Sequence, residues 1–160
     1  MFARSLLLVP FLLPACTTVT DWREMQTDPM TIGEVYDGLL AIAAGDGFAV
    51  DASTSDRGNG LLQSRWRQRT LERHFPGRYR LRAEIMLEEG SALGGWPVRF
   101  AIEQQKVEDL RRSNDPREDD WSDHGQDRER EAIFADKLVR RLAPKSLARP
   151  NAAAADRPAP

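Results

Sequence analysis

The sequence predicts an α+β fold, a two-layer sandwich in which a four-stranded antiparallel meander is covered on one face by two helices. Two observations support this prediction. Residues 78–85 alternate strictly between polar and apolar side chains, which is typical of a half-buried strand. Residues 31–44 and 127–142 repeat apolar side chains every three or four positions, as amphipathic helices do. The expected order of elements is αββββα.

The first helix is expected to begin at Thr31. Thr31 and Glu34 have the spacing of a capping box, in which each side chain accepts a backbone N–H of the other residue. The helix should stop at Gly45-Asp46-Gly47, because glycine accepts the left-handed conformation that ends helices. In the second helix, acidic residues crowd the first turns and Arg140 and Arg141 stand at the end, which suits the helix dipole.

Four strands are expected between the helices. Each shows alternation bounded by turn-forming residues, and they cover residues 48–52, 61–69, 78–87 and 98–103. The stretch 108–126 is dense in charge with a single large apolar side chain, Trp121, and is expected to be a long surface loop.

The overall composition limits the function. The chain has 160 residues, room for one domain, with 41% hydrophobic residues and a net charge of −2, so no basic field attracts nucleic acid. One cysteine excludes an intrachain disulfide, and His74 and His124 are too few for a zinc site. No motif of nucleophilic catalysis or phosphate binding is present. We therefore expect no enzyme activity, no cofactor and no metal.

The N-terminus has the order of a secretory signal. Residues 1–15 hold Arg4, a proline-broken apolar run and a small residue before Cys16. Leu13-Pro14-Ala15-Cys16 resembles the lipobox of bacterial lipoproteins, in which the cysteine becomes the acylated first residue of the mature chain. The resemblance implies a membrane anchor of several acyl chains, including palmitate, at Cys16. The alternative is an ordinary secretory signal or a noncleaved N-terminus.

The same resemblance implies a location. No aspartate follows Cys16, so the outer membrane, facing the periplasm, is expected rather than the inner membrane. Beyond the signal peptide at 1–15 we expect a tether at 16–30, a single α+β domain at 31–142 and a disordered Ala/Pro-rich tail at 143–160. Cleavage removes Arg4 and no acid, which leaves 22 basic and 25 acidic residues, a charge of −3.

Strand alternation predicts an arginine-rich surface. If Trp66 and Leu81 point toward the helices, seven arginines share the opposite sheet face. They are Arg65, Arg67, Arg69, Arg78, Arg80, Arg82 and Arg99. Like charges on neighbouring strands destabilise a sheet, so negative groups should lie on this face.

Three sources of negative charge are open. Glutamates of the same strands, the acidic loop 108–127, or an external partner such as an envelope protein, an anionic lipid or a polymer could pair with these arginines. The loop residues 115–123 have oxygen ligands for calcium but lack the spacing of an EF-hand. Trp66 and Trp96 are expected in the core or at a sheet edge, and a sugar-binding role would need both on one surface.

Residues 48–66 show a further resemblance. A helix that ends in glycine, an F-x-V strand, an acidic glycine-bearing turn and an Arg-aromatic strand end are similar to the domains of BamC-like (NlpB-like) envelope lipoproteins. The matching positions are Phe48, Val50, Asp56, Arg57, Gly60, Arg65 and Trp66. The resemblance implies helices packed on an antiparallel sheet and a role beside outer-membrane assembly machinery.

The functional hypothesis is thus a noncatalytic accessory or scaffold lipoprotein of cell-envelope assembly, bound to the membrane through Cys16. The alternatives are a module that binds an anionic lipid or polymer on the arginine face, and an enzyme or enzyme activator, which would require a concave pocket with convergent polar groups.

Overall fold

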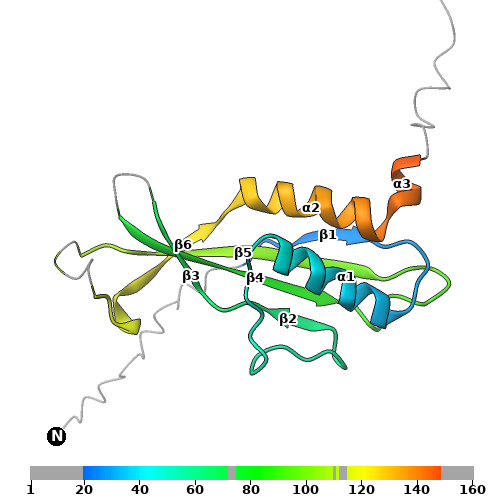
Figure 1. Ribbon diagram of the computed structural model, residues 1–160, viewed down its shortest axis with the longest axis horizontal. Coiled ribbons are helices and arrows are strands. Elements are labelled where there is room, and N and C mark those ends of the chain that lie inside the picture. The colour runs from blue at the N-terminus through cyan, green and yellow to red at the C-terminus, as the bar shows by residue number, and fades with distance from the viewer. Residues whose placement is uncertain (1–19, 72–74, 110, 112–114, 149–160) are drawn as a thin grey trace, which may run out of the picture.

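The structure is a computed structural model that describes residues 20–71, 75–109, 111 and 115–148. It confirms the α+β class, with helices packed on one face of an antiparallel sheet (Figure 1). In this part of the chain the helices are α1 (Ile32–Gly45), α2 (Arg128–Leu142), the short α3 (Pro144–Ala148) and the 3-10 helix η3 (Glu118–Asp120). The six strands are β1 (Arg23–Gln26), β2 (Leu61–Gln63), β3 (Arg67–Thr70), β4 (Pro76–Ile85), β5 (Pro97–Val107) and β6 (Trp121–Gln126).

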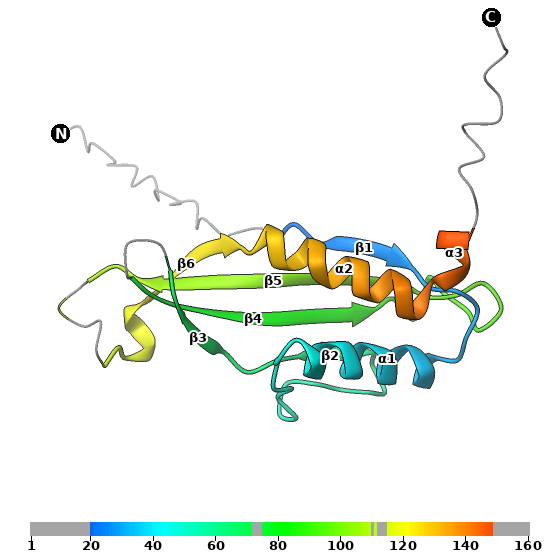
Figure 2. The same ribbon diagram turned by 45° about the horizontal axis from the view of Figure 1, so that its top comes forward.

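The sheet is built around the long hairpin β4–β5, as Figure 2 shows. β2 and β3 pair one after the other with the free edge of β4, and β1 and β6 do the same with the free edge of β5. The predicted four-stranded meander is therefore wrong in strand number and order. β1 lies in the expected tether 16–30, and β6 lies in the expected loop 108–126.

The first predicted strand, 48–52, is reduced to a single bridge between Val50 and Ser64. Two backbone hydrogen bonds flank that bridge, from Arg65 to the Ala49 carbonyl and from Asp51 to the Gln63 carbonyl, both 2.8 Å. The Asp51 carboxylate then accepts the backbone N–H of the residue two positions ahead at 3.1 Å, which starts a turn. The sequence correctly predicts that residues 48–52 pair with the segment that follows them, but this turn limits the pairing to one bridge.

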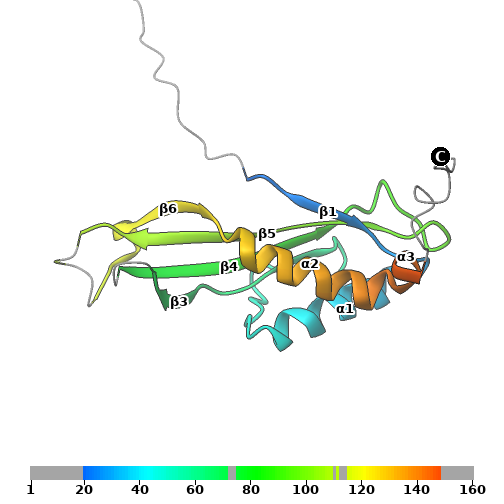
Figure 3. The ribbon, with the colours of Figure 1, turned by 90° about the horizontal axis from the view of Figure 1, so that it is seen from above.

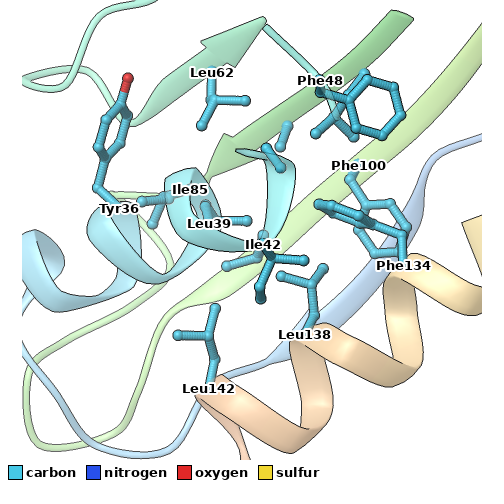
Figure 4. Packing of buried hydrophobic residues seen from close by; sticks show 14 of the residues in the cluster. Tyr36, Leu39, Ile42, Phe48, Leu62, Ile85, Phe100, Phe134, Leu138 and Leu142 are labelled. Carbon is cyan, nitrogen blue, oxygen red and sulfur yellow. The ribbon is translucent and has the colours of Figure 1, made fainter. Parts of the chain in front are cut away.

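A hydrophobic core fills the space between the sheet and the two long helices. The members labelled in Figure 4 are Tyr36, Leu39, Ile42, Phe48, Leu62, Ile85, Phe100, Phe134, Leu138 and Leu142. The Phe134 ring lies 5.3 Å from that of Phe100 and 6.4 Å from that of Phe48. α1 approaches α2 closely at Gly38, where a Cβ would lie 2.5 Å from a Leu142 methyl carbon.

Side-chain caps fix where both helices begin. Glu34 accepts the Thr31 N–H at 2.7 Å and donates its own backbone N–H to the Thr31 hydroxyl at 3.3 Å, so the predicted capping box is confirmed. Asp127 caps α2 by accepting the Arg130 N–H at 3.1 Å. These caps satisfy N–H groups that have no partner within the helix.

The start of α2 also completes the edge of the sheet. β1 and β6 leave a gap along β5 at Ile102, whose carbonyl accepts the Asp127 N–H at 2.8 Å. The Ile102 N–H donates to the Glu131 carboxylate at 3.0 Å, and Glu131 is fully buried. Two hydrogen bonds join the side chain of Gln126, the last residue of β6, to the backbone of Asp21, two residues before β1. From the sequence, Glu131 is only one of the acidic residues near the start of the second helix that suit the helix dipole.

Candidate functional site

The candidate site is the outer face, the side of the sheet away from α1 and α2 (Figure 3). Alternation along β4 and β5 places seven polar residues there, namely Arg78, Arg80, Arg82, Glu84, Arg99, Glu103 and Gln105. The register sets Arg78 opposite Gln105, Arg80 opposite Glu103 and Glu84 opposite Arg99. Four of the seven predicted arginines therefore share this face.

For two of the other three arginines, Arg67 and Arg69, the prediction is wrong. β3 pairs Arg67 with Tyr79 and Arg69 with Gly77, which turns both arginines toward the helix side. Arg69 forms an ion pair with Asp127 at 2.7 Å. Arg65 lies between β2 and β3, where its backbone bonds to the segment before β2.

A one-residue bulge between β2 and β3 explains the error. Ser64 is the last residue in the β2 register: its N–H donates to the Leu81 carbonyl, and its hydroxyl accepts the Leu81 N–H, both at 2.9 Å. Pairing resumes at Arg67, which lies opposite Tyr79. The chain thus advances three residues from Ser64 to Arg67, while β4 advances only two, from Leu81 to Tyr79. The extra residue reverses the faces. It also brings Trp66 to the outer face, against the expectation that it points toward the helices.

Carboxylates of the same strands pair with three of the outer-face arginines. The Glu103 carboxylate accepts from Arg80 at 2.7 Å and from Arg82 at 2.9 Å. Glu84 pairs with Arg99 at 2.5 Å across the β4–β5 ladder. These contacts agree with the first of the three hypotheses, in which the strands supply their own negative charge.

Tryptophan rings are stacked against the same guanidinium groups. Trp22 lies under Arg82 and Arg99, with ring centroids 5.3 and 5.0 Å from the guanidinium carbons, and Trp66 lies 4.4 Å from that of Arg80. These are cation–π distances. With Trp121, three of the four tryptophans of the chain lie on this face.

Trp96 lies away from this surface. It packs against the core, and its indole N–H donates to the Met30 carbonyl at 2.9 Å. The two tryptophans that a sugar platform would need on one surface, Trp66 and Trp96, are therefore on different sides.

Arg78 is the most enclosed arginine of the outer face, with a side chain 8% exposed. Its guanidinium carbon lies 4.6 Å from the Trp66 ring and 4.5 Å from the Trp121 ring, and its Nε donates to Gln105 at 2.7 Å. Its two terminal nitrogens bind the Glu118 carboxylate at 2.8 and 2.5 Å, which lowers the pKa of Glu118. One residue of the acidic loop 108–127 thus reaches the face, as the second hypothesis expects.

A pocket of about 280 Å³ opens on the outer face beside the ion pairs of β4 and β5. Its lining includes Trp66, Arg82, Glu103 and Thr20, the first residue that the structure describes. The chain therefore enters the domain at the outer face.

A second hollow, of about 360 Å³, lies on the helix side and mixes both signs of charge. Arg69 and Arg130 both contact Asp127 there, and Lys137 pairs with Asp46. Within the described residues, no group of three or more His, Cys, Asp or Glu side chains is placed to hold a metal ion, and this includes 115–123. Cys16, His74 and the segments 1–15 and 149–160 lie outside the described residues.

No protein-family model matches the chain, and no curated protein matches it. Among the helices of the described part of the chain, none combines the length and the apolar character needed to cross a membrane.

Proposed function

We propose that the protein is a noncatalytic lipoprotein of the outer membrane, anchored through acylated Cys16 and facing the periplasm, that serves as an accessory or scaffold in cell-envelope assembly. The outer face carries this proposal. It gathers Trp22, Trp66 and Trp121 with arginines on a rigid sheet, and tryptophan and arginine are enriched where protein partners bind most strongly.

The charges of this face favour a protein over an anionic polymer or lipid. Four arginines meet three carboxylates, Glu84, Glu103 and Glu118, in short ion pairs. A polyanion would have to compete with each of these carboxylates for the same guanidinium N–H groups. A protein surface can instead bury the flat tryptophan and arginine side chains while those pairs stay formed.

The position of the anchor agrees with this arrangement. Thr20 already lines a pocket of the domain, and Trp22 stacks on outer-face arginines. Thr20 is four positions after Cys16, and four steps along the chain span at most about 14 Å. An acyl anchor at Cys16 would therefore hold the outer face close to the membrane surface, where envelope partners assemble.

Lipid attachment is tested by expressing the full chain in a bacterium supplied with labelled palmitate. Label should enter the wild type and co-fractionate with the outer membrane. Cys16→Ala should lose both the label and the membrane fraction, because no other cysteine is present. Label-free wild type in the soluble fraction would refute the anchor.

Partner binding is tested by recovery of the tagged protein from detergent-solubilised envelopes. The variant Arg82→Ala/Arg99→Ala alters the outer face, and Arg140→Ala/Arg141→Ala removes the same charge from an exposed helix end. A specific protein held by the wild type and the helix variant, but lost by the outer-face variant, supports the proposal. Equal recovery by all three contradicts it, and recovery of lipid or polymer alone supports the anionic-ligand alternative.

A further inference from the structure

The guanidinium of Arg78 is held in place by Trp66, Trp121 and Gln105, and we call these four residues the Arg78 clamp. The Trp66 and Trp121 rings lie 4.6 and 4.5 Å from its central carbon, and Gln105, its partner across β4 and β5, accepts the Nε–H at 2.7 Å. These contacts fix the plane and direction of the group. Its two terminal nitrogens are left to bind one further acceptor in the guanidinium plane.

Glu118 occupies that position without being buried there. Its two carboxylate oxygens accept from Nη1 and Nη2 of Arg78 at 2.8 and 2.5 Å, yet its side chain is 79% exposed. The stem of Glu118 therefore adds little packing. What the clamp holds is the carboxylate group alone.

The clamp does not depend on Glu118 for its shape. The 3-10 turn that carries Glu118 is closed by its own hydrogen bonds, since the Arg117 N–H donates to the Asp120 carboxylate and the Asp120 N–H donates to the Arg117 carbonyl. Trp121 is held by its pairing with Val107 in the sheet. Withdrawal of the Glu118 side chain would leave both the turn and the ring in place.

We propose that the Arg78 clamp is a docking site for a single carboxylate on a peptide segment of a partner protein, and that this carboxylate replaces Glu118. The inference rests on the proposed function only in taking the partner to be a protein. Glu118 then acts as an internal occupant that keeps the guanidinium paired until the partner binds. The partner gains the two-point bond together with contacts to the adjoining tryptophans.

The chemistry of the clamp favours a carboxylate over other anions. Two N–H groups in a fixed fork match two oxygens in one plane, which is the geometry of a carboxylate. Asp123 pairs with Gln105 across β5 and β6, so a group with several negative charges would meet a like charge beside the clamp. The ligand that fits best carries one negative charge.

The test uses the full chain in detergent and two synthetic peptides of alanine and serine with an acetylated N-terminus and an amidated C-terminus, one with a single glutamate and one with glutamine in its place. Binding is followed by NMR at the indole N–H groups of Trp66 and Trp121 and the Nε–H of Arg78. Glu118→Ala should bind the glutamate peptide at least about tenfold more tightly than the wild type, because the internal competitor is gone. Asp119→Ala, which removes the same charge from the next exposed residue, should match the wild type.

The glutamine peptide should bind none of these proteins, and Glu118→Ala/Arg78→Lys should lose the gain, because lysine lacks the planar fork. If that double variant does not fold, the comparison of the two peptides on Glu118→Ala alone tests the inference. Equal weak binding of both peptides, or equal binding of inorganic phosphate, would overturn the inference. Because the experiment needs neither lipid nor an envelope partner, its failure is distinguishable from failure of the proposed function.

Discussion

The two faces of the sheet exclude water by different means. The helix side buries apolar side chains, such as Leu81 and Phe100, under two amphipathic helices. Neither α1 nor α2 covers the outer face, where arginine guanidinium groups lie over tryptophan rings. Ala101, on this face, is nonetheless fully buried.

This difference separates stability from recognition. Apolar burial supplies most folding free energy, whereas half-exposed ion pairs contribute about 0 to 1 kcal/mol each. Side chains of the outer face can therefore be replaced at small cost to the stability of the fold. Four variants or conditions test this comparison, from the largest expected effect to the smallest.

Phe134→Ala should give the largest effect. Phe134 is 1% exposed and contacts two other aromatic rings, so its truncation should lower the free energy of unfolding by about 3 to 5 kcal/mol, as measured by urea denaturation. The neighbouring Ile133 is 51% exposed, and Ile133→Ala should cost less than about 0.5 kcal/mol. Equal losses from the two variants would contradict the assignment of the core to this side.

Glu131→Ala should give an intermediate effect. The change leaves the Ile102 N–H without its acceptor and removes a partner of Arg128, which should cost about 1 to 3 kcal/mol. Native-state hydrogen exchange should show faster exchange at the Ile102 amide. Glu129→Ala removes an exposed acid from the same turn and should cost only a few tenths of a kcal/mol. Unchanged protection at Ile102 would show that Glu131 does not close the sheet edge.

Arg99→Ala should give a small effect that depends on salt. It removes the ion pair with Glu84 and the stacking on Trp22, for about 0.2 to 1 kcal/mol. The loss should shrink between about 0.1 M and about 1 M salt, because screening weakens half-exposed pairs. The loss from Phe134→Ala should stay constant over the same range. A salt-independent loss at Arg99 would mean that the outer face is held by packing.

Protonation of Glu118 at the Arg78 clamp should give the smallest effect. The hydrogen bond from Arg78 holds the pKa of Glu118 below its ordinary value of 4.5. Glu118 therefore contributes its full stabilisation above pH 4.5 and loses it as the pH falls through the lowered pKa of the folded state. Tryptophan fluorescence should report this step, and Glu118→Gln should lack it. The same acid transition in both proteins would assign the change to other carboxylates.

The elements that the sequence predicted well are those whose sequence pattern lies within the element itself. β4 alternates over nearly its whole length, and α1 begins with a capping box that involves only Thr31 and Glu34. The shared face of Arg78, Arg80 and Arg82 on β4 follows from that alternation, and the same pattern in β5 fixes the face of Arg99. These features need no knowledge of which segments meet in space.

The features that were missed depend on pairing between distant segments. β1 and β6 are short, and β6 is mostly polar, so they become strands only by hydrogen bonding to β5. The bulge after Ser64 adds one residue without any turn-forming signal, and it moved Arg67, Arg69 and Trp66 to faces opposite to those predicted. Glu131 is buried because it fills the gap between β1 and β6, and no local sequence pattern predicts that gap.

The closure of the sheet edge constrains the order in which the chain can fold. Asp21 and Gln126 are 105 positions apart, and the gap between their strands is filled by Glu131, so the edge of β5 stays unprotected until almost the whole domain has been synthesised. Contacts of such sequence separation form slowly, and unpaired strand edges attract other chains. A chain shortened before Glu131 should therefore self-associate, and the nascent protein should need a holdase until its last helix is free to dock.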